Sequence, residues 1–203
     1  MRQFFRFVLV FLLAAAPAAA QEPASPQQLF ESGQNDQALQ RIAQEREQGT
    51  LQPADAYLAG QVLVKVNRDD EARAEFERLA TSGDPILSLV GQSAVAMVNN
   101  ENERAVELAT QAVAAGPESF QAHYQLGHAK SKFEDWAACA EEFHQAATLD
   151  PTFAYAHYYA GLSYSRIKRA DRTSEHFERF LKLAPKAPER AAVESLMRTL
   201  RGR

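Results

Sequence analysis

The sequence predicts an all-α fold, in which helix–turn–helix repeats stack into a right-handed superhelical solenoid. The first observation is that Pro117, Pro151 and Pro185 are 34 residues apart. The second is that other residues obey the same offset, as Gly127 and Gly161 do. The third is that apolar side chains within each period recur at three- and four-residue steps, the spacing of one helix face. A single unit of this kind cannot bury its own apolar face, so the units must stack.

The N-terminal residues 1–20 predict a secretory signal peptide. Arg2 and Arg6 precede an apolar run at 7–16, and small residues follow as far as Ala20. This order of a basic start, a short apolar run and a small-residue site is typical of a cleaved signal. The alternative is an uncleaved membrane anchor, but the run is shorter than the ~20 residues of a spanning helix. We therefore expect a mature chain that is secreted or periplasmic, with no stable membrane span.

The rest of the chain divides into a partial repeat, four full repeats and a cap. Residues 21–52 are expected to form a linker and a partial first repeat. The expected boundaries of the four full repeats are 53–85, 86–119, 120–153 and 154–187. Residues 188–203 are expected to form a C-terminal capping helix, because Pro188 suits a helix start and Val193 and Leu196 belong to one apolar stripe.

The residue pattern within one period resembles that of the tetratricopeptide repeat family. The third full repeat carries the pattern best, with Tyr124, Leu126, Gly127, Trp136, Cys139, Phe143, Ala146, Asp150 and Pro151. The resemblance implies a solenoid whose concave groove is lined by the first helix of each unit. It also implies a protein that binds other proteins. Members that hold the C-terminal tails of chaperones use a lysine and asparagine clamp. This sequence has tyrosines where that lysine should be, so we do not expect it to bind a chaperone tail.

The resemblance places a set of tyrosine, basic and neighbouring side chains on the groove. The residues that we expect to bind a partner are Tyr57, Gln61, Lys65, Tyr124, His128, Lys132, Tyr155, Tyr158, Leu162 and Arg166. Tyrosine and arginine are common interface anchors, and a partner segment with carboxylates and apolar groups would suit this surface. The alternative is that Tyr124 and Tyr158 are partly buried in helix packing.

Composition and motifs argue against catalysis and against nucleic acid as a partner. The net charge of −4 lacks the basic excess that phosphate binding needs. The single cysteine, Cys139, cannot form an internal disulfide or a cysteine zinc site, and we expect it to be a buried structural thiol. The five histidines include no H-E-x-x-H pair, and the S-x-x-K match at Ser165–Lys168 lacks its companion motifs. We expect no enzyme activity, no metal and no cofactor.

Two functions remain open from the sequence. The favoured one is an adaptor in the periplasm or cell envelope that binds a segment of another protein in the concave groove. The alternative is a structural or homodimeric scaffold subunit of a cell-envelope assembly. The alternative rests on the apolar second repeat, where Val90, Ala94, Met97 and Val98 share a face.

Overall fold

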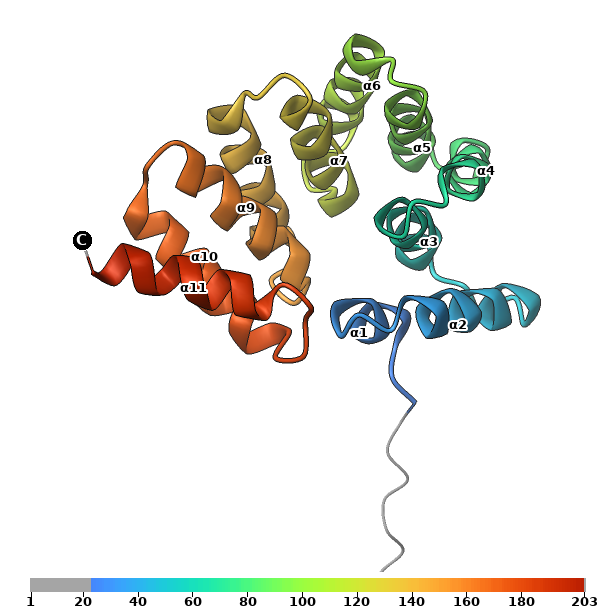
Figure 1. The fold of residues 1–203 in the computed structure, drawn as a ribbon. Coiled ribbons are helices and arrows are strands. Elements are labelled where there is room, and N and C mark those ends of the chain that lie inside the picture. The colour runs from blue at the N-terminus through green and yellow to red at the C-terminus, as the bar shows by residue number, and fades with distance from the viewer. Residues whose placement is uncertain (1–22, 203) are drawn as a thin grey trace, which may run out of the picture.

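The computed structural model describes residues 23–202, and within that range it contains eleven helices and no strand (Figure 1). The helices are α1 (Pro26–Glu31), α2 (Asn35–Glu47), α3 (Pro53–Lys65), α4 (Asp69–Ala80), α5 (Pro85–Val98), α6 (Asn102–Ala115), α7 (Phe120–Ser131), α8 (Trp136–Leu149), α9 (Ala154–Arg166), α10 (Ala170–Leu183) and α11 (Arg190–Arg201). The predicted signal peptide and its alternative, a membrane anchor, fall outside the described residues. Along residues 23–202, none of the helices has the length and hydropathy of a membrane span.

The turns inside the helix pairs repeat one backbone conformation. Each has one residue in the left-handed region, at Gly33, Asn67, Asn100, Glu134 and Lys168, with φ between +56° and +78°. Glycine and asparagine adopt this region more readily than other residues. Because Gly33 precedes Asn67 by 34 residues, and the other positions follow at steps of 33 or 34, α1 and α2 form a pair of the same kind. In that pair the first helix is only six residues long.

Glycines let the two helices of a pair approach closely. A Cβ added at Gly127 of α7 would lie 2.8 Å from the ring of Phe143 in α8. A Cβ at Gly161 of α9 would lie 2.5 Å from the ring of Phe177 in α10. In each pair the aromatic ring therefore occupies the space that a side chain would need. The same arrangement joins α3 to α4 at Gly60.

The array of pairs curves until its two ends meet. Figure 1 shows α1 beside the loop that joins α10 to α11. Lys65 at the end of α3 forms an ion pair with Glu189 of that loop, with 2.6 Å between Nζ and Oε1. Phe30 of α1 lies against Tyr155 of α9, with 4.7 Å between ring centroids. The concave side is therefore an enclosed space, bounded by helices from both ends of the chain.

The last helix, α11, packs on the fourth full pair as a cap. Its own side chains Val193 and Met197 are buried, and so is Phe180 of α10. Leu196, which belongs to the predicted apolar stripe, is instead 39% exposed. The cap therefore contacts the array through a face that includes Met197 in place of Leu196.

Candidate binding site

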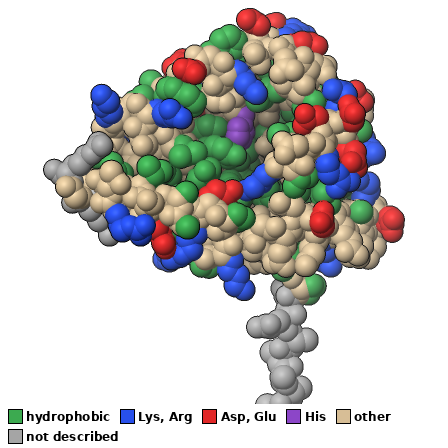
Figure 2. Space-filling view, viewed as in Figure 1, with side chains coloured by type: hydrophobic (Ala, Val, Ile, Leu, Met, Phe, Trp, Pro, Cys, Tyr) green, Lys and Arg blue, Asp and Glu red, His purple; other side chains and the backbone are tan. Residues whose placement is uncertain are grey.

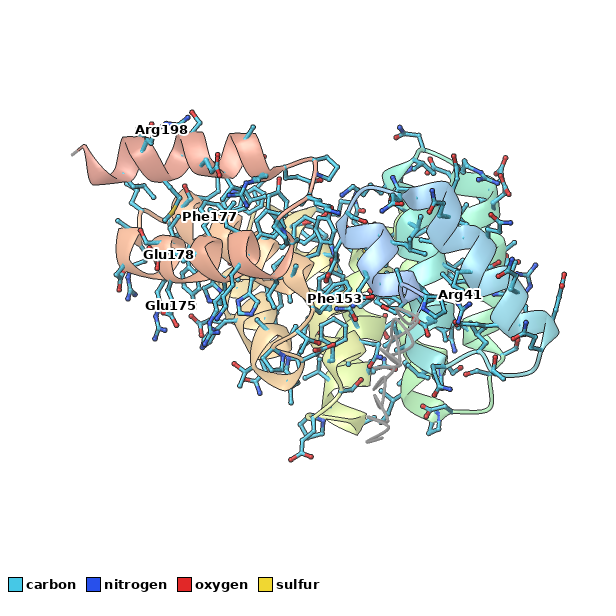
Figure 3. All side chains as sticks on the ribbon, turned by 90° about the horizontal axis from the view of Figure 1, so that it is seen from below. Arg41, Phe153, Glu175, Phe177, Glu178 and Arg198 are labelled. Carbon is cyan, nitrogen blue, oxygen red and sulfur yellow. The ribbon has the colours of Figure 1, made fainter. Side chains whose placement is uncertain are left out.

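An aromatic cluster fills the centre of the enclosed space. Tyr124 of α7 is 2% exposed, and its ring centroid lies 5.3 Å from that of Phe153 and 6.3 Å from that of Tyr57. Figure 3 shows Phe153 where the N-terminal helices meet the C-terminal half of the molecule. Tyr155 continues the cluster towards Phe30. We call these five residues the central plug, because Phe30 and Tyr124 line one cavity whereas Tyr57 and Phe153 line another, smaller one.

A chain of buried hydrogen bonds reinforces the central plug. The hydroxyl of Tyr57 donates to Oε1 of Gln125 at 2.7 Å, which ties α3 to α7. Nε2 of Gln125 donates to the hydroxyl of Ser93 at 3.1 Å, and that hydroxyl donates to the carbonyl of Ala105 at 2.8 Å. Both Gln125 and Ser93 are fully buried, so these bonds satisfy polar groups that would otherwise be costly to bury. Ser93 stands where the neighbouring repeats have glycine, and this network gives the serine its role.

A cavity of about 360 Å³ opens on one side of the central plug. Its walls come mainly from the C-terminal halves of α3, α5 and α7. The residues that line it are Phe30, Gln61, Val64, Lys65, Asp69, Phe76, Ala94, Met97, Val98, Asn100, Tyr124, Gln125, His128, Ser131, Lys132 and Tyr159. Figure 2 shows a hollow on this face with hydrophobic side chains and a histidine inside it. The volume lies within the range of small ligand pockets, roughly 300–1,000 Å³.

His128 forms part of the aromatic wall of this cavity. Its ring lies 4.6 Å from Tyr124, 4.6 Å from Tyr159 and 5.0 Å from Phe143, measured between centroids. Burial, and then the charge of Lys132, lowers the pKa of His128 to about 3. Among the described residues its buried Nε2 has no hydrogen-bond partner. At neutral pH this histidine is therefore an uncharged aromatic surface.

Two lysines lie at the mouth of the cavity, and among the described residues only one of them is paired with a carboxylate. Lys65 is held by Glu189 and by the hydroxyl of Tyr155. Lys132 is exposed and has no ion pair within residues 23–202. Asp69 begins α4, where the free N–H groups of the first turn favour a negative charge. Lys132 is therefore the cation at this mouth that is available to an anionic group.

The structure brings together half of the residues predicted for the groove. Gln61, Lys65, Tyr124, His128 and Lys132 line the cavity. The other half comprises residues that do not line it, namely Tyr57, Tyr155, Tyr158, Leu162 and Arg166. The division follows the helices, because α3 and α7 face the cavity along their C-terminal halves whereas most of α9 does not.

The tyrosines expected to be exposed anchors are packed inside the protein. Tyr57 and Tyr155 are 3% and 1% exposed, and they belong to the central plug with Tyr124. Tyr158 is half-buried against Phe180, with 5.1 Å between ring centroids. The packing alternative therefore describes these tyrosines better than the open-groove expectation. The reason is the closure of the array, which covers the concave faces of α3 and α9.

Arg166 and Leu162 lie away from the cavity on the second half of α9. The guanidinium carbon of Arg166 lies 5.3 Å from the centre of the Trp136 ring, a cation–π contact. Leu162 is half-buried against the hydrophobic core. Neither side chain contributes to the mouth that Lys132 occupies.

Sequence reasoning missed several residues of the cavity wall. Val64, Phe30 and Tyr159 have no motif that would mark them. Met97 and Val98 did carry a signal, the apolar character of the second repeat. In the structure Val90 and Ala94 of that repeat are buried, and Met97 and Val98 line the cavity. The residues that suggested a dimer contact therefore lie inside the array.

Outside the cavity, three histidines and the single cysteine lie in the packed helices of the C-terminal half. His176 lies between His144 and His157, with ring nitrogens 3.2 and 3.1 Å apart. Within residues 23–202 no three His, Cys, Asp or Glu side chains are grouped so that they could hold a metal ion. Cys139 is fully buried, and burial raises the pKa of its thiol to about 11. The thiol is therefore protonated at neutral pH, as expected for a structural cysteine.

Comparison with known proteins gives structural but not sequence matches. No protein-family model matches the chain, and no curated protein is recognisably similar to it. Among solved structures, the chain is similar to TTC0263, a tetratricopeptide repeat protein of Thermus thermophilus. That match has a TM-score of 0.59 and 16% identity, and it covers 86% of this chain and 94% of the other.

Two further matches are to proteins with peptide sites. The tetratricopeptide protein YrrB, described as having an unusual peptide-binding site, matches with a TM-score of 0.51 and 19% identity, covering 84% of this chain and 88% of the other. The first tetratricopeptide domain of Spaghetti (RPAP3), bound to the HSP90 peptide SRMEEVD, matches with a TM-score of 0.52 and 16% identity, covering 58% and 90%. At these identities the likeness concerns the fold. The repeated turns, the glycine–aromatic pairs and these matches together show that the chain has the tetratricopeptide-repeat fold.

Proposed function

We propose that the protein is a non-catalytic interaction module that binds a segment of another protein at the cavity beside the central plug. The observation that carries the proposal is a cavity with both apolar and polar walls that has the unpaired cation Lys132 at its mouth. The peptide sites described for YrrB and for the RPAP3 domain support the use of this fold for binding protein segments.

The central plug determines how much of a partner can enter. An extended chain cannot pass through the interior, because Tyr57, Tyr124 and Phe153 fill the axis of the array. A volume of about 360 Å³ has room for one large side chain with part of its backbone. The partner therefore inserts one side chain into the cavity and lays the rest of the segment across the mouth.

The chemistry of the walls selects that side chain. Val64, Met97 and Val98 present aliphatic and thioether groups, while Tyr124 and Tyr159 present aromatic rings. A large apolar or aromatic side chain gains free energy by leaving water for such a pocket. A carboxylate near the inserted residue would pair with Lys132 at the mouth. We therefore propose a partner segment that carries a bulky apolar residue beside an acidic one.

A peptide library displayed on phage provides the test. Val64 is 42% exposed at the mouth, so Val64→Glu places a charge in the cavity without disturbing the core. Leu196→Glu is the matched control, because Leu196 is 39% exposed on α11, away from the cavity. We expect the wild-type chain and the Leu196→Glu variant to enrich the same apolar–acidic peptides, and the Val64→Glu variant to lose them.

A second variant tests the role of charge. In Lys132→Glu the preference for an acidic neighbour should change to a preference for a basic one. Enrichment of the same peptides by the wild type and by Val64→Glu would refute the assignment of the cavity. If the wild type enriches peptides that the Leu196→Glu variant does not bind, the binding site is on α11.

The proposed compartment is the periplasm or cell envelope. This part of the proposal rests on the basic, apolar and small-residue order of residues 1–20. Mass spectrometry of the protein recovered from fractionated cells should find an N-terminus at Gln21 in the envelope fraction. An intact Met1 in the cytoplasmic fraction would refute it.

A further inference from the structure

The short helix α1 is seated in a cleft made by parts of the chain that are far away in sequence. Phe30 of α1 is 4% exposed and contacts both the ring of Tyr155 and the ammonium of Lys65, which is 5.1 Å from the centre of the Phe30 ring and 4.0 Å from that of Tyr155. Nε2 of Gln27 donates to the carbonyl of Thr152 at 3.1 Å. We call this cleft between α3 and the start of α9 the α1 seat.

Glu31 makes the second anchoring contact of α1. Its Oε1 accepts a hydrogen bond from the backbone N–H of Ala154 at 2.7 Å. Ala154 is the first residue of α9, and the preceding residue, Phe153, provides no side-chain cap for that helix. A carboxyl group from another element therefore takes the place of the missing cap at the N-terminus of α9.

Local structure alone does not explain why α1 is held in this position. A helix of six residues is too short to be stable by itself in water. Gly33, two residues beyond the end of α1, has φ +78°, and a Cβ there would lie 2.7 Å from Cγ of Pro188. The position of α1 therefore depends on two anchors, an aromatic ring and an adjacent carboxylate, which is how a short ligand is held by a receptor.

We propose that the α1 seat is a second recognition site, for a partner segment with a phenylalanine followed by a glutamate, and that α1 is its tethered internal competitor. The proposal deepens the proposed function, because it rests on the chain being a module that binds protein segments. The seat offers an aromatic and cationic pocket beside the backbone N–H of Ala154, which complements an aromatic–acidic pair. Phe30 also lines the cavity of about 360 Å³ beside the central plug, so displacement of α1 would join the seat to that cavity.

Tethering determines the affinity that a free ligand shows. A short tether gives α1 an effective concentration in the millimolar range, against which any external segment must compete. Variants that remove or displace α1 should therefore bind an external copy of α1 more tightly than the wild type does. Phe30→Ala/Glu31→Ala removes both anchors, while Gly33→Ala keeps them and displaces α1 through its clash with Pro188.

The test uses a fluorescein-labelled peptide with the sequence of residues 23–32, blocked at both ends, and the full chain. Fluorescence anisotropy should show binding to Phe30→Ala/Glu31→Ala that is roughly tenfold or more tighter than binding to the wild type. Gly33→Ala should shift the affinity in the same direction. Adding Lys65→Met to the double variant should weaken binding, and adding Leu196→Glu should leave it unchanged.

Three results would overturn the proposal. The first is no binding to either opened variant while circular dichroism shows that both keep their helices. The second is equal binding of a control peptide in which the phenylalanine and the glutamate are both alanine. The third is equal affinity for the wild type and the opened variants. Binding of the apolar–acidic peptides selected on the cavity beside the central plug is measured in parallel. If those peptides bind but the α1 peptide does not, the seat proposal fails while the proposed function stands.

Discussion

The hydrogen bond between Tyr57 and Gln125 provides the sharpest test of the central plug. Tyr57→Phe deletes a single oxygen and keeps the ring, which contacts Phe76 and Tyr124 at centroid distances of 6.1 and 6.3 Å. The variant leaves Oε1 of Gln125 without a donor in a side chain that is fully buried. Any loss of stability therefore reports the hydrogen bond and not the packing of the ring.

The expected magnitude follows from the burial of Gln125. A buried acceptor that loses its donor costs about 1–3 kcal/mol, whereas an exposed one costs little. Because Gln125 is fully buried, we expect a loss of about 2 kcal/mol in the free energy of unfolding. In the double variant Tyr57→Phe/Gln125→Met neither polar group remains, so most of that loss should be recovered.

Urea unfolding followed by circular dichroism measures both variants against a matched control. Tyr158→Phe is the control, because the hydroxyl of Tyr158 makes no hydrogen bond within residues 23–202 and its removal should change little. A Tyr57→Phe variant within about 0.5 kcal/mol of wild type would refute the reasoning. So would a double variant that is less stable than Tyr57→Phe alone.

Three further predictions concern pH and close packing. Burial raises the pKa of Glu31 from 4.5 to about 7, so the folded state holds this proton more tightly than the unfolded state does. The urea midpoint should therefore fall as pH rises from 4.5 through 7, and the Glu31→Gln variant should not show this fall. Burial, followed by two neighbouring histidines, lowers the pKa of His176 from 6.5 to about 4. The free energy of unfolding should therefore be highest above pH 6.5 and should decline as pH drops through 4. If the His176→Gln variant shows the same decline as the wild type, this prediction is wrong. Gly91→Ala should cost ~1–3 kcal/mol in thermal unfolding, because its Cβ would lie 2.5 Å from a backbone nitrogen of α4. Gly49→Ala, at φ +70° with nothing within 4 Å, should cost less, and the reverse order would refute the packing argument.

The repeat architecture could be predicted from the sequence because its causes are local. The glycine at position 127 and the phenylalanine at 143 meet within one helix pair, and the next pair repeats them 34 residues later. Each such contact spans fewer than twenty residues, so periodicity alone identifies it. The buried state of Cys139 followed from the same pattern, because the small-residue position of each unit faces its partner helix.

The closure of the array could not be predicted in the same way. The ion pair between Lys65 and Glu189 joins residues whose separation exceeds three repeats. Whether they meet depends on the small rotation between successive units, summed along the array, and no single repeat encodes that sum. The candidate site inherits this limit: the tyrosines at 57 and 155 occupy groove positions, but closure turns those positions into core.

The meeting of the two ends also changes how the protein should open and fold. In an open row of repeats the terminal units have one neighbour each, so they fray first and exchange their amide hydrogens fastest. Here the first helix pair and the last pair with its cap share an interface, so each has neighbours on both sides. We expect amide protection in α1 and α9 to be lost together, as one cooperative unit. Contacts such as that between Phe30 and Tyr155 raise the contact order, which should make ring closure the slow final step of folding.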